Sequence, residues 1–184
     1  MIAIEFSHAA AKSLYLQLNM IVMNIKIFLN LLFLLFSFSV KANTRNSGFD
    51  KSAFYSALAA NDVNSINAQL NMVKTSSINE KEAYEGALLM KKAGLITKPA
   101  EKLSLFKAGR LKLEAAIKKD KENAEFSFLR LIIQEHAPKI VEYRNNINAD
   151  VSTIRSNFKT LSPVVQQAIH DYTKKSNFLK PLYP

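Results

Sequence analysis

The spacing of apolar residues most restricts what this chain can fold into. One face after Asp62 is made by apolar residues at intervals of three, four and three: Val63, Ile66, Leu70 and Val73. This is the period of an α-helix. No segment shows sustained alternation of apolar and polar residues between turn residues, so strands are not expected. The sequence predicts an all-α fold, a compact bundle of about six to eight helices.

Capping residues, glycines and prolines predict where the helices begin and end. Asp62 is expected to cap a helix, and Asn79 with Glu82 has the spacing of a capping box. Gly94 follows two lysines, as at a helix C-terminus. The expected helices cover about 50–60, 63–73, 79–94, 97–119, 124–136, 138–146 and 149–158, and a last one starts at Pro163. The tail after Lys175 is expected to be loosely held.

The helix over 97–119 carries two apolar faces. The larger comprises Leu105, Phe106, Gly109, Leu113, Ala116 and Ile117, and the smaller comprises Ala108, Leu111 and Ala115. A helix that is apolar on two sides is expected to be packed on two sides. This segment is therefore predicted to be the central helix of the bundle.

Residues 23–42 have the three parts of a secretory signal peptide. Lys26 precedes an apolar stretch from Ile27 to Val40, and Val40-Lys41-Ala42 forms a cleavage site. We expect cleavage after Ala42, which leaves residues 43–184 as a single helical domain. Residues 1–22 are interpreted as an upstream extension, with translation starting at Met20 or Met23. The alternative is an uncleaved membrane tether, although this apolar stretch is shorter than the roughly 20 residues that a spanning helix needs.

Composition and charge exclude several classes of function. The chain has no cysteine, which excludes disulfides, thiolate metal sites, a cysteine nucleophile and a lipid-bearing cysteine. Three of the 25 basic and one of the 15 acidic residues lie before residue 43, so the expected exported part has a net charge of +8. No arginine-rich helix or interleaved aromatic-basic pattern points to nucleic acid. Contact with an anionic envelope surface stays open.

The sequence offers no catalytic, cofactor or metal site. His136 and His170 have no ligand partner at helical spacing, and we interpret them as solvated or capping residues. Phosphate-loop, H-E-x-x-H and G-x-S-x-G motifs are absent. Glutamates at helix starts, such as Glu82 and Glu125, are expected to serve capping and the helix dipole. The chain is therefore predicted not to be an enzyme.

Four polar residues are weak candidates for ligand binding: Arg110, Ser127, Arg130 and Gln134. The last three form the only clearly polar strip of the apolar segment 124–136. If this segment pairs with 97–119, the four side chains line a groove that binds a carboxylate or a peptide. The alternative is structural: the strip faces solvent, and Arg110 extends its stem over the core.

Two resemblances bear on fold and location. Gly109, Leu113 and Ala116, with KKDKENAE at 118–125, resemble part of a tetratricopeptide hairpin over about 105–133, although Lys121 stands at the family's proline position. The segments YEGALLMKKAGLI, LFKAGRLKLEAAI, NAEFSFLRLIIQEHAPKI and LSPVVQQAIHDY resemble a group of small, exported, functionally uncharacterised helical proteins of Bacteroidota. That resemblance implies an exported helical fold and no particular activity or site.

We therefore expect an exported helical protein that is not an enzyme and acts in the cell envelope, in the periplasm or after secretion. The expected role is interaction or scaffolding through contact with another envelope protein of unknown identity. The alternative is binding of a small anionic ligand or an anionic envelope surface. The sequence does not predict the oligomeric state.

Overall fold

The chain is described by a computed structural model that covers Met20, Met23, Asn24, Lys26 and residues 48–180. It divides into two units, Met1–Arg45 and Asn46–Pro184. In the first unit the four described residues are helical and exposed. The predicted signal peptide over 23–42, its cleavage after Ala42 and the upstream extension 1–22 otherwise lie outside the described residues. Within the described part, no helix has both the length and the apolar character that crossing a bilayer requires.

The second unit is all-helical over residues 48–180, as predicted. Its elements are α2 (Lys51–Ala59), α3 (Val63–Thr75), α4 (Lys81–Leu95), α5 (Pro99–Lys119), α6 (Ala124–His136), the 3₁₀ turn η1 (Lys139–Val141), α7 (Ile147–Asn157), the 3₁₀ turn η2 (Phe158–Thr160) and α8 (Pro163–Thr173). The buried core runs from Phe54 to Leu179. This unit therefore has a hydrophobic core of its own.

Capping explains several helix starts and corrects two predictions. Asp62 accepts hydrogen bonds from the backbone N–H groups of Asn64 and Ser65, as expected of an N-cap. The capping box at Asn79 was a wrong prediction, because α4 begins after Glu80 and has no side-chain cap. Gly94 does not stop α4 either, because the helix continues to Leu95 and ends in extended backbone at Ile96.

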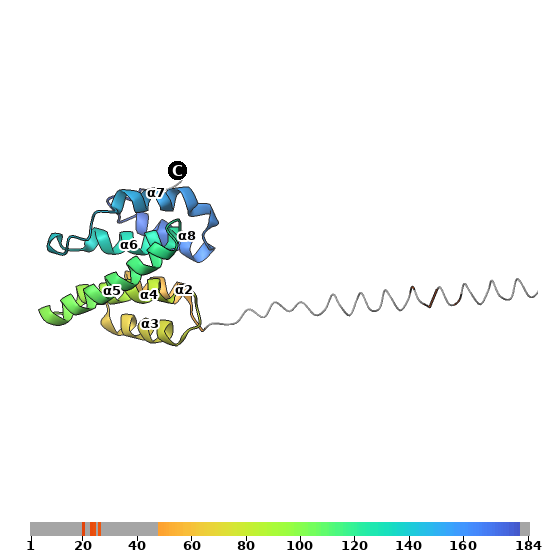
Figure 1. Ribbon diagram of the computed structural model, residues 1–184, viewed down its shortest axis with the longest axis horizontal. Helices are drawn as coiled ribbons and strands as arrows, with labels where there is room; N and C mark the ends of the chain where they lie inside the picture. Colours follow the sequence, from red (N-terminus) through yellow and green to blue (C-terminus); the bar gives the residue numbers. More distant parts are fainter. Residues whose placement is uncertain (1–19, 21–22, 25, 27–47, 181–184) are drawn as a thin grey trace, which may run out of the picture. The chain divides into compact units, whose positions relative to one another are not determined.

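Helices α4 and α5 form a close antiparallel pair (Figure 1). They cross at Gly86 and Gly109, where a Cβ on either residue would lie within 2.7 Å of the other's carbonyl oxygen. Only glycine allows this backbone-to-backbone approach. At the side of the pair, Lys112 binds Glu85 at 3.2 Å and Lys119 binds Glu82 at 3.0 Å.

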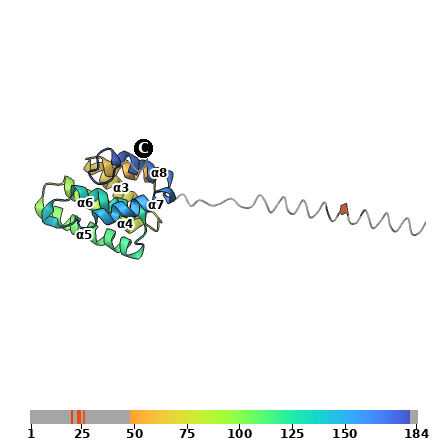
Figure 2. The ribbon, with the colours of Figure 1, turned by 90° about the horizontal axis from the view of Figure 1, so that it is seen from above.

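The central helix is α6, and α5 is not packed on two sides. In Figure 1, α6 lies between α7 and the α4–α5 pair, and it contacts all three helices. Figure 2 shows the unit from above, where α4, α6 and α7 overlap. The smaller apolar face of α5 is open, with Leu111 74% exposed. The prediction for α5 was wrong because alanine-rich faces can be left in water at little cost. The main partner of α5 is α4, and the tetratricopeptide-like hairpin of α5 with α6 is not shown.

Two expectations for the C-terminal third were also wrong. The segment from Pro138 to Asn146 contains only the short turn η1, which ends at Glu142 with a left-handed φ of 46°. The tail is held as far as residue 180, since Leu179 is fully buried. The Ser176 hydroxyl also donates to the Glu135 carboxylate, and the Asn177 N–H donates to the same carboxylate at 3.0 Å. The burial of this one leucine anchors the segment that the sequence predicted to be loosely held.

Candidate functional site

Arg130 is the centre of a buried ion-pair cluster. Its Nε and Nη2 donate to the two carboxylate oxygens of Asp150 on α7 at 2.9 and 2.6 Å. Its Nη1 donates to Glu114 on α5 at 2.9 Å. Asp150 is 1% exposed, and Arg130 is 9% exposed. This bidentate pair ties α6 to α7, and the third bond ties α6 to α5.

The cluster extends to Tyr143 and Arg110. The Tyr143 hydroxyl donates to the second oxygen of Glu114 at 2.6 Å, and the Arg110 guanidinium lies 5.0 Å from the centre of the Tyr143 ring. Burial raises the pKa of Asp150, and the hydrogen bonds and charge of Arg130 oppose that shift. Burial alone would lower the pKa of Arg130, but the bonds and charge of Asp150 and the charge of Glu114 raise it. The cluster balances its charges internally.

The four predicted binding residues do not line one groove. Ser127 and Arg130 line a pocket of about 300 Å³ with Glu114 and Asp150. Gln134 is fully buried, and its amide has no hydrogen-bond partner within the described protein. Arg110 is exposed and stacks over Tyr143. The structural alternative was also wrong for the strip, because Ser127, Arg130 and Gln134 are buried rather than solvent-facing.

Glu125 has a role that the sequence interpretation missed. Its Oε1 accepts hydrogen bonds from the hydroxyls of Tyr55 and Tyr84 at 3.0 and 2.6 Å, and its Oε2 binds Lys51 at 2.8 Å. Burial, and then the charge of Glu125, raise the pKa of both tyrosines. Glu125 therefore joins α6 to α2 and α4 rather than acting only on the dipole of α6. A charged residue early in an otherwise apolar helix was the available signal.

An apolar groove of about 1120 Å³ lies in the second unit. It is lined by side chains of five helices that are far apart in the sequence. Its apolar lining includes Leu58, Met90, Leu103, Phe106, Phe128, Ile132, Ile140, Val164, Ala168 and the ring of Tyr172. Three of these lining residues are exposed: Ile140 is 91%, Leu103 48% and Val164 40% exposed. We call this cavity the groove.

Charged residues on the groove are mostly cationic. Lys91, Lys102 and Lys175 line it, and Asp171 is the single carboxylate among the lining residues. Asp171 is already bound to Lys174 at 2.8 Å and to Gln167 at 3.0 Å. Lys91 donates to the amide oxygen of Asn61 at 3.1 Å. Neither Lys91 nor Lys175 forms an ion pair within the described residues.

Lys91 and Lys175 act on each other through their charges. Burial, and then the nearby charge of Lys175, lower the pKa of Lys91. The Lys175 ammonium lies 5.6 Å from the centre of the Tyr172 ring. Two like charges with no acidic partner cost free energy in the folded protein. An anion between them would relieve that repulsion.

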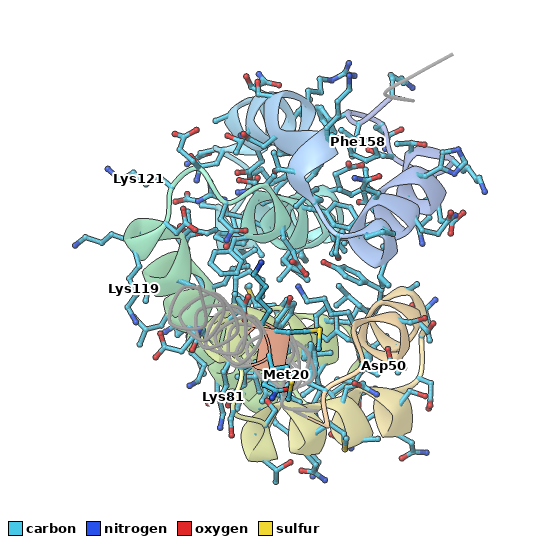
Figure 3. The ribbon with its side chains drawn as sticks, turned by 90° about the vertical axis from the view of Figure 1, so that its right-hand side faces the viewer. Met20, Asp50, Lys81, Lys119, Lys121 and Phe158 are labelled. Atoms are coloured by element: carbon cyan, nitrogen blue, oxygen red, sulfur yellow. The ribbon has the colours of Figure 1, made fainter. Side chains whose placement is uncertain are left out.

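The histidines and acidic residues do not form a metal site in the part of the chain that is described. His136 lines the groove, and its Nδ1 lies 2.9 Å from the carbonyl oxygen of Ile132. His170 is exposed on α8, close to Asp171. The basic residues at the end of α5 project outward, as Lys119 and Lys121 do in Figure 3. The groove is therefore the candidate functional site.

No protein-family model, no curated protein and no solved structure matches the chain.

Proposed function

We propose that this chain is an exported binding protein without enzymatic activity, and that the groove holds an apolar ligand. The observation that carries the proposal is the groove itself, about 1120 Å³ of mostly apolar lining built from five helices. Small-molecule sites are commonly concave, mostly apolar and on the order of 300–1000 Å³. Filling the groove would cover apolar side chains that the fold leaves open to water.

Export is the second part of the proposal, and it rests on the sequence of residues 23–42. A lysine, a short apolar stretch and Val40-Lys41-Ala42 support secretion with cleavage after Ala42. Intact mass of the chain recovered from the envelope or medium tests this part. A first residue of Asn43 is expected, and an uncleaved chain would contradict it.

The ligand-binding part is tested with N-phenyl-1-naphthylamine, an uncharged fluorescent probe of apolar sites. Residues 43–184 contain the whole Asn46–Pro184 unit and its core, so this fragment serves as the sample. We expect saturable fluorescence enhancement at one site. Ala168→Phe places a ring in the groove and should abolish it, because Ala168 lines the cavity. Ala108→Phe on the exposed side of α5 is the matched control and should bind normally.

A second candidate function is contact with a protein partner, as expected from the sequence. It is favoured by the exposed apolar residues at the edge of the groove, Ile140 above all. A photo-crosslinking residue at position 140, introduced in cells, should form one discrete adduct that Ala168→Phe removes. The same residue at position 111 is the control, because Leu111 is exposed but lies outside the groove. Equal adducts from both positions would contradict a specific partner.

A further inference from the structure

The groove combines an apolar interior with a cationic pair that has no acidic partner. Lys91 comes from the last turns of α4, and Lys175 follows α8, so the fold places two lysines from distant parts of the sequence on the lining of one groove. Elsewhere in this unit, cationic side chains of low exposure are paired with carboxylates. Arg130 forms ion pairs with Glu114 and Asp150, and Lys51 forms one with Glu125. At the groove the single carboxylate, Asp171, is bound to Lys174, and neither Lys91 nor Lys175 forms an ion pair with any described residue.

We infer that the ligand of the groove is a single-chain amphiphile whose anionic head binds between Lys91 and Lys175 while its apolar chain lies along the groove. This inference rests on the proposed function and adds the chemical class of the ligand. A carboxylate is the matching head group, because it accepts hydrogen bonds from both ammonium groups and cancels their repulsion. The apolar lining suits an acyl chain, which gains about 0.8 kcal/mol for each buried CH₂ group.

The nearby acidic groups do not oppose this placement of the head. Asp171 is neutralised by Lys174 and bonded to Gln167. Glu135 lies close enough to Tyr172 to raise the pKa of its hydroxyl, together with burial, but its carboxylate is occupied by Ser176 and by the N–H of Asn177. Asn61 is the polar neighbour of Lys91. Its amide N–H₂ supplies further donors for an anion.

The test compares dodecanoate with 1-dodecanol as competitors for bound N-phenyl-1-naphthylamine at pH 7. Both have the same chain, and only the first carries a charge. We expect dodecanoate to displace the probe at about tenfold lower concentration, because a hydrogen bond to a charged group is worth about 1.5–3 kcal/mol. The double variant Lys91→Met/Lys175→Met should lose this preference and still bind the probe. The control Lys118→Met/Lys121→Met removes the same charge outside the groove and should keep it.

The outcomes separate this inference from the proposed function. If the probe binds but dodecanol competes as well as dodecanoate, the anionic ligand is wrong and the apolar groove stands. If the probe does not bind at all, the proposed function fails first. If the double variant keeps the full preference, the head does not lie at Lys91 and Lys175. Binding to anionic lipid vesicles without displacement by free dodecanoate would also overturn the inference and assign the charge to a membrane surface.

Discussion

The Arg130 cluster and the groove are two regions of one helical unit that differ in whether their charged side chains form ion pairs. In the cluster, every strong charge has a partner: Asp150 and Glu114 neutralise Arg130, and Tyr143 binds Glu114. In the groove, Lys91 and Lys175 share an apolar surface without an acidic partner. A satisfied network specifies which helices pack together, whereas an unsatisfied one leaves binding capacity for something outside the chain. Arg130, the residue that looks most functional in the sequence, has its guanidinium bonded to Asp150 and Glu114.

The largest expected effect on stability comes from removing Arg130 from its cluster. Arg130→Met should reduce the free energy of unfolding by about 3–5 kcal/mol, because it leaves the Asp150 carboxylate buried without a cationic partner. Urea denaturation of residues 43–184 measures this. The double variant Arg130→Met/Asp150→Leu removes both charges and should recover most of the loss. A single variant as stable as the unmodified protein would show that the pair is not buried as described.

Acid should partly rescue the Arg130→Met variant. Burial raises the pKa of Asp150, and without Arg130 nothing opposes that shift except the hydrogen bond from Ser127. A carboxyl with a raised folded-state pKa is penalised above that pKa and relieved below it. The stability difference from the unmodified protein should therefore shrink as the pH falls from 7 to 5. Urea denaturation at several pH values tests this, and a difference that grows on acidification would contradict it.

The next largest effect on the free energy of unfolding is expected at the glycine contact between α4 and α5. Gly109→Ala places a Cβ 2.6 Å from the Gly86 oxygen and 2.8 Å from Met90, so the helices must separate. We expect a loss of about 1–3 kcal/mol in the free energy of unfolding. Gly94→Ala is the control, because a Cβ there meets no atom within 4 Å. It should stabilise the protein by up to about 1 kcal/mol. Equal effects would mean that α4 and α5 do not cross at these glycines.

The affinity of the groove for an anionic ligand should depend on pH through Lys91. Its pKa is lowered by burial and by Lys175, so its charge should be lost below the ordinary lysine value of about 10.4. Affinity for dodecanoate should therefore fall as the pH rises from 8 to 10, while affinity for dodecanol stays constant. Lys91→Met should flatten this part of the profile, and an unchanged slope would contradict the assignment.

The smallest effect on stability is expected at an exposed ion pair, which serves as the reference for the buried pair of Arg130. The side chains of Lys119 and Glu82 are 72% and 49% exposed, and they lie 3.0 Å apart. Lys119→Met should change the free energy of unfolding by less than about 0.5 kcal/mol, because such pairs are hydrated and screened by salt. Urea denaturation in low and high salt checks this. A loss comparable to that of Arg130→Met would remove the contrast between buried and exposed pairs.

The sequence predicted helix bounds well where a cap, a proline or an apolar run marks them. The bounds of α5 and α6 follow from Pro99 and from the apolar run after Asn123, and Asp62 caps α3 as expected. Errors arose where tertiary packing decided the outcome. Periodicity alone does not reveal that Leu111 stays exposed or that Leu179 is buried. It also assigned the close helix pairing to α5 and α6, because the complementary glycines Gly86 and Gly109 become informative only once their distance is known.

The candidate site was less predictable than the fold. The sequence identified Arg130 as unusual but not its partners, since Asp150 and Glu114 lie on other helices. The groove has no local signal at all, because five helices contribute its lining. From the sequence, Lys91 is a charge near a helix end, and only its place on the groove with Lys175 makes it a candidate for binding an anion.

The most direct test of the central claim uses dodecanoate labelled with ¹³C at its carboxyl carbon. Bound to residues 43–184, the labelled carbon should give one resolved NMR signal whose titration shows a pKa well below that of the free acid, because Lys91 and Lys175 favour the carboxylate. In Lys91→Met/Lys175→Met that lowering should disappear. A bound signal whose pKa is raised, as expected for a carboxyl buried among apolar groups alone, would contradict the account.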